Sequence, residues 1–207
     1  VEITRMVISL ENDLYMLDGV AGDVYRAVFT GDGFELDLEF RCGSVPTPLI
    51  VGPLVDIEVL PPGNPNSATV IGMDANGNLA QCIPAGKDQL SFPMAPPDSN
   101  WGSPQAFAMD SGDLFVLDPL TNSVWVYDGA SEYRELPNFF FGDQVPSLQD
   151  VVDLTVSDGR LYLLYRDGHL TTSFYGSDDF TDPAIYQDPR DGFENSSTIG
   201  DAIFNQI

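Results

Sequence analysis

The chain has 207 residues, of which 43% are apolar and 11% aromatic, so it can bury one sizeable globular core. Thirty-two acidic residues against eight basic ones give a formal charge of −24, which argues against nucleic acid and anionic membrane surfaces as partners. No apolar stretch reaches the roughly 18 residues that a membrane-spanning helix needs, so no membrane insertion is expected in this segment.

The predicted elements are almost all strands, because apolar and polar residues alternate and no three-turn helical period is free of glycine and proline. The alternation predicts four groups of four strands, at about 3–42, 54–93, 105–141 and 151–188, joined by proline-rich crossings. In chain order, the expected strands are 3–9, 13–18, 24–29 and 34–40; 54–60, 68–74, 79–84 and 88–93; 105–109, 113–118, 123–128 and 133–140; and 151–157, 160–166, 169–175 and 182–188.

The groups repeat one motif, an apolar strand followed by a polar turn and a second strand, at a spacing of roughly 50 residues. Asp13-Leu-Tyr-Met-Leu-Asp18 and Asp113-Leu-Phe-Val-Leu-Asp118 show it most clearly. A strand-only repeat of this length predicts an all-β fold, a β-propeller with four four-stranded blades. Residues 201–207 resemble the first strand of a fifth blade, which predicts further blades of the same polypeptide. The alternative is that this strand closes a four-bladed ring with the first blade.

Two cysteines lie in neighbouring predicted blades: Cys42 follows the first blade, and Cys82 lies in the third strand of the second. They are too few for a structural zinc site. A disulfide between them would contribute roughly 4 kcal/mol and favour an oxidising compartment. The alternative is two separate buried thiols.

No residue is assigned a catalytic or metal-binding role. His169 is the only histidine, it follows a predicted hairpin, and nothing near it resembles a nucleophile elbow. Asp74-Ala-Asn-Gly-Asn78 begins like a calcium loop, but Leu79 stands where the loop needs glycine and Ala85 where it needs glutamate. That segment is therefore predicted to be a hairpin turn.

Four aspartates, Asp18, Asp74, Asp118 and Asp167, end or follow the second strand of their blades. In a propeller these positions lie on the face that carries the inter-blade crossings. A ring of four carboxylates there predicts a binding site for a cationic partner, either a basic protein surface or calcium. The alternative is that each carboxylate caps the amides of its own turn. Trp101, in a crossing, is predicted to be a further partner contact.

The segment Leu114–Asp128 resembles the repeat of NHL-type six-bladed propellers, in which a strand and an aspartate precede a small turn and an aromatic strand. The whole chain also resembles a propeller module of bacterial cell-envelope proteins of the Chloroflexota, through Gly52–Asp56, Gly72–Leu79 and Phe139–Pro146. In some of those proteins the module follows a PPM-type phosphatase domain. The resemblance implies a six-bladed ring in the cell envelope or outside the cell, and it transfers no catalytic residue.

The sequence therefore favours a non-catalytic propeller that binds a protein partner or a small ligand through loops on one acidic face. One alternative is a hydrolase similar to gluconolactonase, with a divalent cation held in the central channel. The innermost strands offer acids for it but no matching asparagines; these acids are Glu2, Asp56, Glu58, Asp110 and Asp153. The other alternative is a structural repeat in an extracellular assembly. Fold alone does not decide between them.

Overall fold

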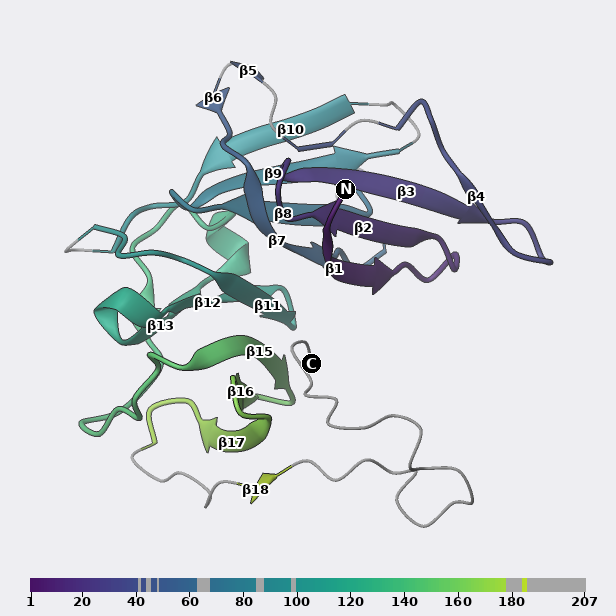
Figure 1. Ribbon diagram of the computed structural model, residues 1–207. Helices are drawn as coiled ribbons and strands as arrows, with labels where there is room; N and C mark the ends of the chain where they lie inside the picture. Colours follow the sequence, from purple (N-terminus) through teal and green to yellow (C-terminus); the bar gives the residue numbers. More distant parts are fainter. Residues whose placement is uncertain are drawn as a thin grey trace, which may run out of the picture.

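Four antiparallel sheets of four strands follow one another along the chain in the computed structural model (Figure 1). The first two sheets contain Ile3–Ile8 (β1), Leu14–Asp18 (β2), Asp23–Phe29 (β3) and Phe34–Leu36 (β4), then Leu54–Val59 (β7), Val70–Asp74 (β8), Asn78–Ile83 (β9) and Asp88–Pro93 (β10). The others contain Ala106–Asp110 (β11), Asp113–Asp118 (β12), Ser123–Tyr127 (β13) and Asn138–Phe139 (β14), then Val151–Ser157 (β15), Arg160–Tyr165 (β16), His169–Phe174 (β17) and Ala184–Ile185 (β18). The prediction of four four-stranded blades is confirmed.

The structure describes residues 1–40, 42–43, 46–47, 49–62, 68–84, 88–97, 100–177 and 184–185. Residues 201–207, predicted to begin a fifth blade, lie outside this set, as does most of the predicted strand 182–188. Within the described residues, no helix is long and apolar enough to cross a membrane.

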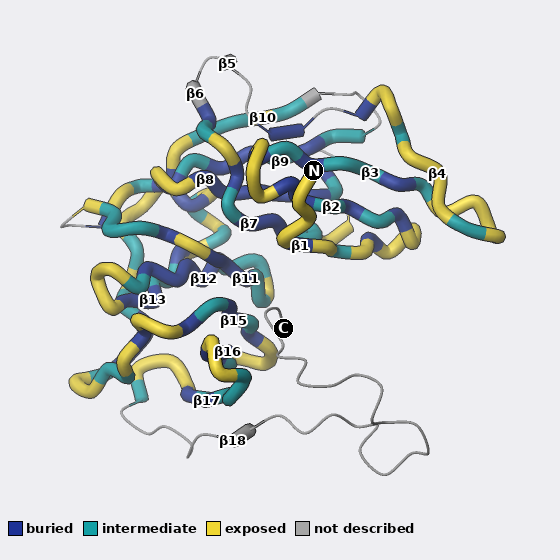
Figure 2. Tube along the Cα trace, viewed as in Figure 1, coloured by how far each residue is buried: buried dark blue, intermediate teal, exposed yellow. Residues whose placement is uncertain are grey.

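The first strands of the blades lie innermost, and each contacts the first strand of the next blade: β1 contacts β7, β7 contacts β11, and β11 contacts β15 (Figure 1). This is the arrangement of a β-propeller. Because side chains alternate across each strand, every blade has two faces that need cover. The buried positions accordingly follow the inner strands (Figure 2).

An apolar core fills each space between neighbouring blades. Tyr15 and Leu17 of β2 pack with Ile57 and Val70 between the first and second blades. Residues of β8 and β12, including Met73 and Leu114, form the second core, and residues of β12, β15 and β16 form the third. Burial of these side chains, at about 25 cal/mol per Å² of apolar surface, stabilises the succession of blades.

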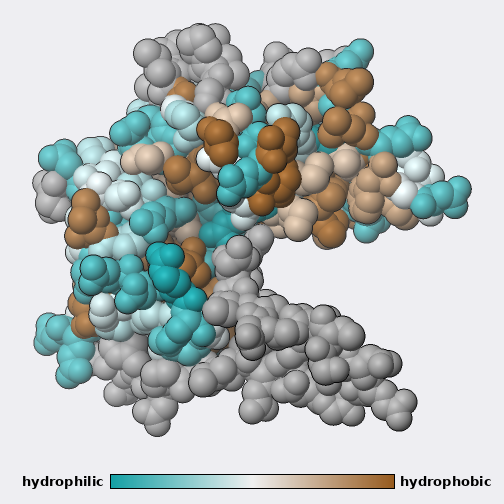
Figure 3. Space-filling view, in the orientation of Figure 1, coloured by the Kyte–Doolittle hydropathy of each residue, from teal (hydrophilic) through white to brown (hydrophobic). Residues whose placement is uncertain are grey.

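The outer face of the first blade differs from these packed faces. Met6 and Ile8 on β1 are 54 and 60% exposed. Phe34 and Leu36 on β4 are 50 and 52% exposed. Hydrophobic side chains accordingly gather on the surface around β1 and β4 (Figure 3). Among the described residues, nothing covers this face as the second blade covers the opposite one.

Two predicted outer strands are shorter than expected because the chain turns within the ranges predicted for them. After β4, the Asp37 carboxylate accepts hydrogen bonds from the amides of Glu39 and Phe40, which turns the chain. Before β14, Gly129–Ser131 forms a 3₁₀ turn (η2), and Glu132 and Tyr133 adopt φ values of 52° and 62°. Left-handed residues interrupt a strand. The first crossing also contains a short hairpin, Pro46–Thr47 (β5) and Leu49–Ile50 (β6).

Cys42 and Cys82 form a disulfide with a Cα–Cα distance of 5.7 Å. It joins the chain that follows the first blade to β9 of the second, and both residues are buried in the core between these blades. The bond therefore closes a loop with a sequence separation of 40 residues across an inter-blade interface.

Candidate binding site on the crossing face

The last residue of the second strand is an aspartate in each of the first three blades, and its carboxylate binds backbone amides. Asp74 Oδ2 accepts a hydrogen bond of 2.7 Å from the Gly52 amide, in the crossing that enters the blade. Asp74 Oδ1 accepts bonds of 2.8 and 2.9 Å from the amides of Asn76 and Asn78, in the turn that follows. Each such carboxylate thus replaces water as the partner of amides that the turn leaves unpaired.

Asp118 accepts the amides of Gly102 and Ser103, at 2.7 and 2.8 Å, and Asp18 accepts those of Val20 and Ala21. These three carboxylates are therefore structural caps. Asp18, Asp74 and Asp118 are only 4, 1 and 0% exposed. Their amide contacts are those of the capping alternative, and the binding of a cationic partner by these carboxylates stays a prediction. No group of three or more His, Cys, Asp and Glu side chains suited to a metal occurs in the described part of the chain.

Replacing Asp74 by alanine is expected to lower the free energy of unfolding by about 2–4 kcal/mol, because three partly buried hydrogen bonds lose their acceptor. Urea denaturation of the wild type and the variant measures the loss. Asp74→Asn keeps an acceptor oxygen, so its free energy of unfolding should fall less than that of Asp74→Ala. Equal stability of Asp74→Ala and the wild type would contradict the capping role.

Trp101 is half-buried and packs within the protein. Its ring stacks on Tyr127 of β13, with centroids 5.9 Å apart and an interplanar angle of 27°. It also lies against Gly77 in the β8–β9 turn, where φ is 75° and any Cβ would collide with the indole. Trp101 therefore fastens the turn of the second blade to the third blade, a role that the predicted partner contact did not include.

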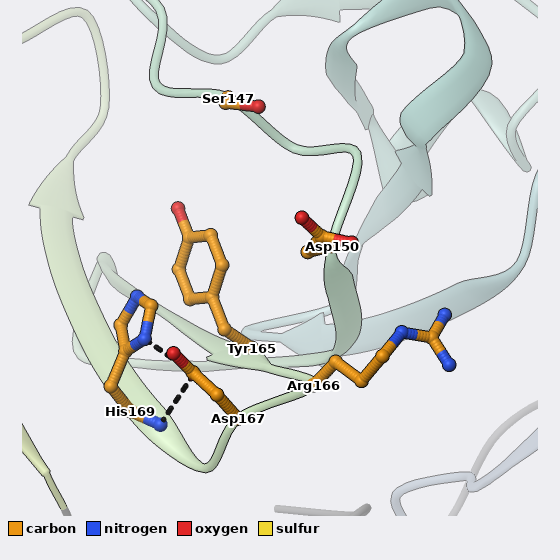
Figure 4. Close-up of a pocket in the computed structure, with 6 residues that line it drawn as sticks. All are labelled: Ser147, Asp150, Tyr165, Arg166, Asp167 and His169. Atoms are coloured by element: carbon orange, nitrogen blue, oxygen red, sulfur yellow. Dashed lines mark hydrogen bonds and ion pairs between the residues drawn. The ribbon is translucent and has the colours of Figure 1, made fainter.

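The fourth blade breaks the capping pattern. In the strand register, Leu54 pairs with Asp74, and Val151 pairs with Tyr165 in the same way. Tyr165 therefore occupies the cap position, and Asp167 lies two residues further on, in the turn. Next to this position is a pocket of about 500 Å³, which we call the Tyr165 pocket (Figure 4). Its lining residues are Ser147, Asp150, Tyr165, Arg166, Asp167 and His169.

The aromatic wall of the Tyr165 pocket is held in place by the β16–β17 turn. The ring of His169 stacks on Tyr165 with centroids 4.1 Å apart and an interplanar angle of 16°. Asp167 Oδ1 lies 2.5 Å from His169 Nδ1 and accepts the His169 amide at 3.2 Å (Figure 4). The hydrogen bond from this amide is the main cause that lowers the pKa of Asp167. The β16–β17 turn therefore holds the side chains of Tyr165, Asp167 and His169 in fixed positions along one wall of the pocket.

The crossing from the third blade forms the other wall of the Tyr165 pocket. The Arg166 amide donates a hydrogen bond of 2.8 Å to the Asp150 carbonyl, which ties the crossing to β16. The Asp150 carboxylate lies on the side of the Tyr165 ring opposite His169, and the Arg166 guanidinium points away from that ring (Figure 4). An aromatic surface, two carboxylates and hydroxyl groups therefore converge on one hollow.

At the centre of the propeller, Arg5 links the innermost strands. Arg5 Nε lies 2.9 Å from Asp56 Oδ1, and Nη2 lies 2.6 Å from Asp153 Oδ1. Asp56 Oδ2 also accepts the Phe107 amide at 2.7 Å, so one cluster joins β1, β7, β11 and β15. Arg5, Asp56 and Asp153 each follow a register shift in their strand, which re-aims the side chain.

Burial is the main cause that raises the pKa of Glu58, a neighbour of this cluster, to about 7. The folded protein therefore binds a proton on Glu58 more tightly than the unfolded chain, and stability falls as pH rises from about 4.5 to about 7. Glu58→Gln removes this dependence, so the variant should be more stable than the wild type at about pH 8, by on the order of 2 kcal/mol. Urea denaturation across this pH range tests it; parallel pH profiles for the two proteins would refute it.

Comparisons with known proteins support the fold. No protein-family model matches the chain, and no curated protein matches it. Among solved structures, the chain is similar to the crystal structure of RRP9 WD40 repeats, with a TM-score of 0.56 and 13% sequence identity over 83% of this chain. The fold is a β-propeller. The chain spans about half of that structure's length, since the match covers 48% of it.

Proposed function

We propose that the protein is a non-catalytic β-propeller module that binds a partner protein through the Tyr165 pocket and the crossing face around it. One observation carries the proposal: three blades fill the cap position with a buried aspartate, and the fourth replaces it with tyrosine beside a pocket. Propellers often serve as scaffolds for protein binding, with the specific contacts in their loops.

The composition of the Tyr165 pocket supports recognition of a ligand. Binding sites commonly combine an aromatic surface with a few convergent polar groups, as Tyr165 and His169 do with Ser147 and Asp150. The Cys42–Cys82 disulfide supports a location outside the cell or in the cell envelope, because such bonds persist in oxidising compartments.

The hydrolase alternative receives less support from the centre of the propeller. A divalent cation in the channel would need acids such as Asp56 and Asp153 as ligands. Both already form ion pairs with the buried guanidinium of Arg5, which occupies one oxygen of each carboxylate. We therefore favour binding over catalysis.

A peptide library displayed on phage tests the proposal, selected on the wild type and screened against Ser147→Phe. Ser147 is exposed, so phenylalanine there should obstruct the pocket without disturbing the core. Selected peptides should bind the variant at least about tenfold more weakly in fluorescence anisotropy. The control is Ser157→Phe, an equally exposed position at the other end of β15. Peptides that bind all three proteins equally would contradict the proposal.

A further inference from the structure

We propose that the Tyr165 pocket receives the cationic side chain of a lysine or arginine from the partner. This inference rests on the proposed function and names the chemistry that the site recognises. It follows from the charge of the pocket, from the aromatic residue in its wall, and from the hydroxyl at its rim.

The charge of the Tyr165 pocket favours a cation. Its carboxylates are Asp150 and Asp167, and its one guanidinium, Arg166, is directed away from the aromatic wall (Figure 4). Asp167 is engaged by His169. The Asp150 carboxylate, which is exposed, has no hydrogen bond or ion pair to a described residue. The chain's formal charge of −24 adds a field that attracts cations to any open site.

Tyr165 is 9% exposed and belongs to the core between the third and fourth blades, so the pocket meets only the part of its ring that this core and His169 leave uncovered. His169 stacks on one side of Tyr165, and Asp150 lies beyond the other (Figure 4). An ammonium or guanidinium between the Tyr165 ring and Asp150 would gain a cation–π contact together with an ion pair. The Ser147 hydroxyl lines the same hollow and suits a remaining N–H donor.

Other ligand classes fit less well. An anion would meet two carboxylates. A calcium ion takes 6–8 oxygen ligands, and a site with one unengaged carboxylate and an aromatic wall supplies too few. The volume of about 500 Å³ accommodates a long side chain with part of its backbone.

The single histidine of the chain provides a direct test. The Hε1 resonance of His169 is followed by NMR during titration with a Gly-Ser peptide that carries three lysines or three arginines, and with the same peptide carrying norleucine. The cationic peptides should shift the resonance saturably, and norleucine should not. Asp150→Asn should weaken binding at least about tenfold. Asp32→Asn removes the same charge from an exposed turn of the first blade and should leave binding nearly unchanged.

Four results would overturn the inference, three of them from this titration. Equal weakening by the two aspartate variants would show general charge attraction, an equal response to norleucine would show apolar recognition, and no saturable shift with either cationic peptide would show that the pocket does not bind them. Library peptides that depend on the pocket but lack basic residues would overturn this inference and leave the proposed function standing. Library peptides indifferent to Ser147→Phe would remove the proposed function itself.

Discussion

Replacing Arg5 by methionine is expected to lower the free energy of unfolding by about 3–5 kcal/mol, the usual cost of leaving buried charges without their partner. Asp56 and Asp153 are 2 and 3% exposed, and both form ion pairs with the Arg5 guanidinium. Methionine fills a similar volume, so the loss would reflect charge rather than a cavity. Urea denaturation at neutral pH measures it.

The same variant should respond to pH in a defined direction. Burial raises the pKa of Asp56, and the Arg5 charge opposes that rise. Without Arg5 the carboxyl should take up a proton at higher pH, so the stability deficit of Arg5→Met should shrink from about pH 8 to about pH 5. Arg5→Lys keeps the positive charge but has a single ammonium group in place of the forked guanidinium. Its free energy of unfolding should therefore fall less than that of Arg5→Met. A deficit that is small and independent of pH would contradict the central role of Arg5.

Removing the Cys42–Cys82 disulfide is expected to cost about 4 kcal/mol, the loop-entropy value for a separation of 40 residues. The bond also holds the end of the first blade against β9, so its loss should loosen that interface first. A Cys42→Ala/Cys82→Ala double variant avoids a buried unpaired thiol. Its urea midpoint, compared with that of the oxidised and reduced wild type, measures the effect.

Thiol titration of the denatured, unreduced protein provides the control for this prediction. No free thiol should be detected, and two should appear after reduction. Two free thiols before reduction, or equal midpoints for the oxidised and reduced wild type, would contradict a stabilising bond.

The blade architecture could be predicted from the sequence because strand alternation and turn residues are local signals. β2 and β12 begin and end within a residue of the predicted bounds. The outer strands could not be predicted as well, since the chain turns at Asp37, directly after β4, and at Glu132 and Tyr133, before β14 begins. Alternation alone does not show where a side chain will cap an amide.

The candidate site was only partly predictable. The repeated aspartates were visible, but the sequence does not tell whether a carboxylate turns outward or binds amides of a crossing more than 15 residues away, as Asp74 does with Gly52. The sequence pattern assigns the fourth position to Asp167, whereas the strand register assigns it to Tyr165. Comparing Leu161-Tyr-Leu-Leu-Tyr165 with Leu14-Tyr-Met-Leu-Asp18 is the signal that could have shown it.

The centre of the propeller could not be predicted at all. Arg5 and Asp153 are 148 residues apart in sequence, and nothing local marks either as the other's partner. Only the closing of successive blades brings them together.

Amide hydrogen exchange of the protein with and without a library-selected peptide tests the central claim most directly. The account predicts that protection on binding is concentrated at the third crossing and the β16–β17 turn, around Ser147, Asp150 and residues 166–169. The turns capped by Asp18 and Asp74, and the crossing amides bound by Asp118, should exchange equally with and without the peptide, because these amides already have partners. Protection centred on another blade, with no change around the Tyr165 pocket, would contradict the account.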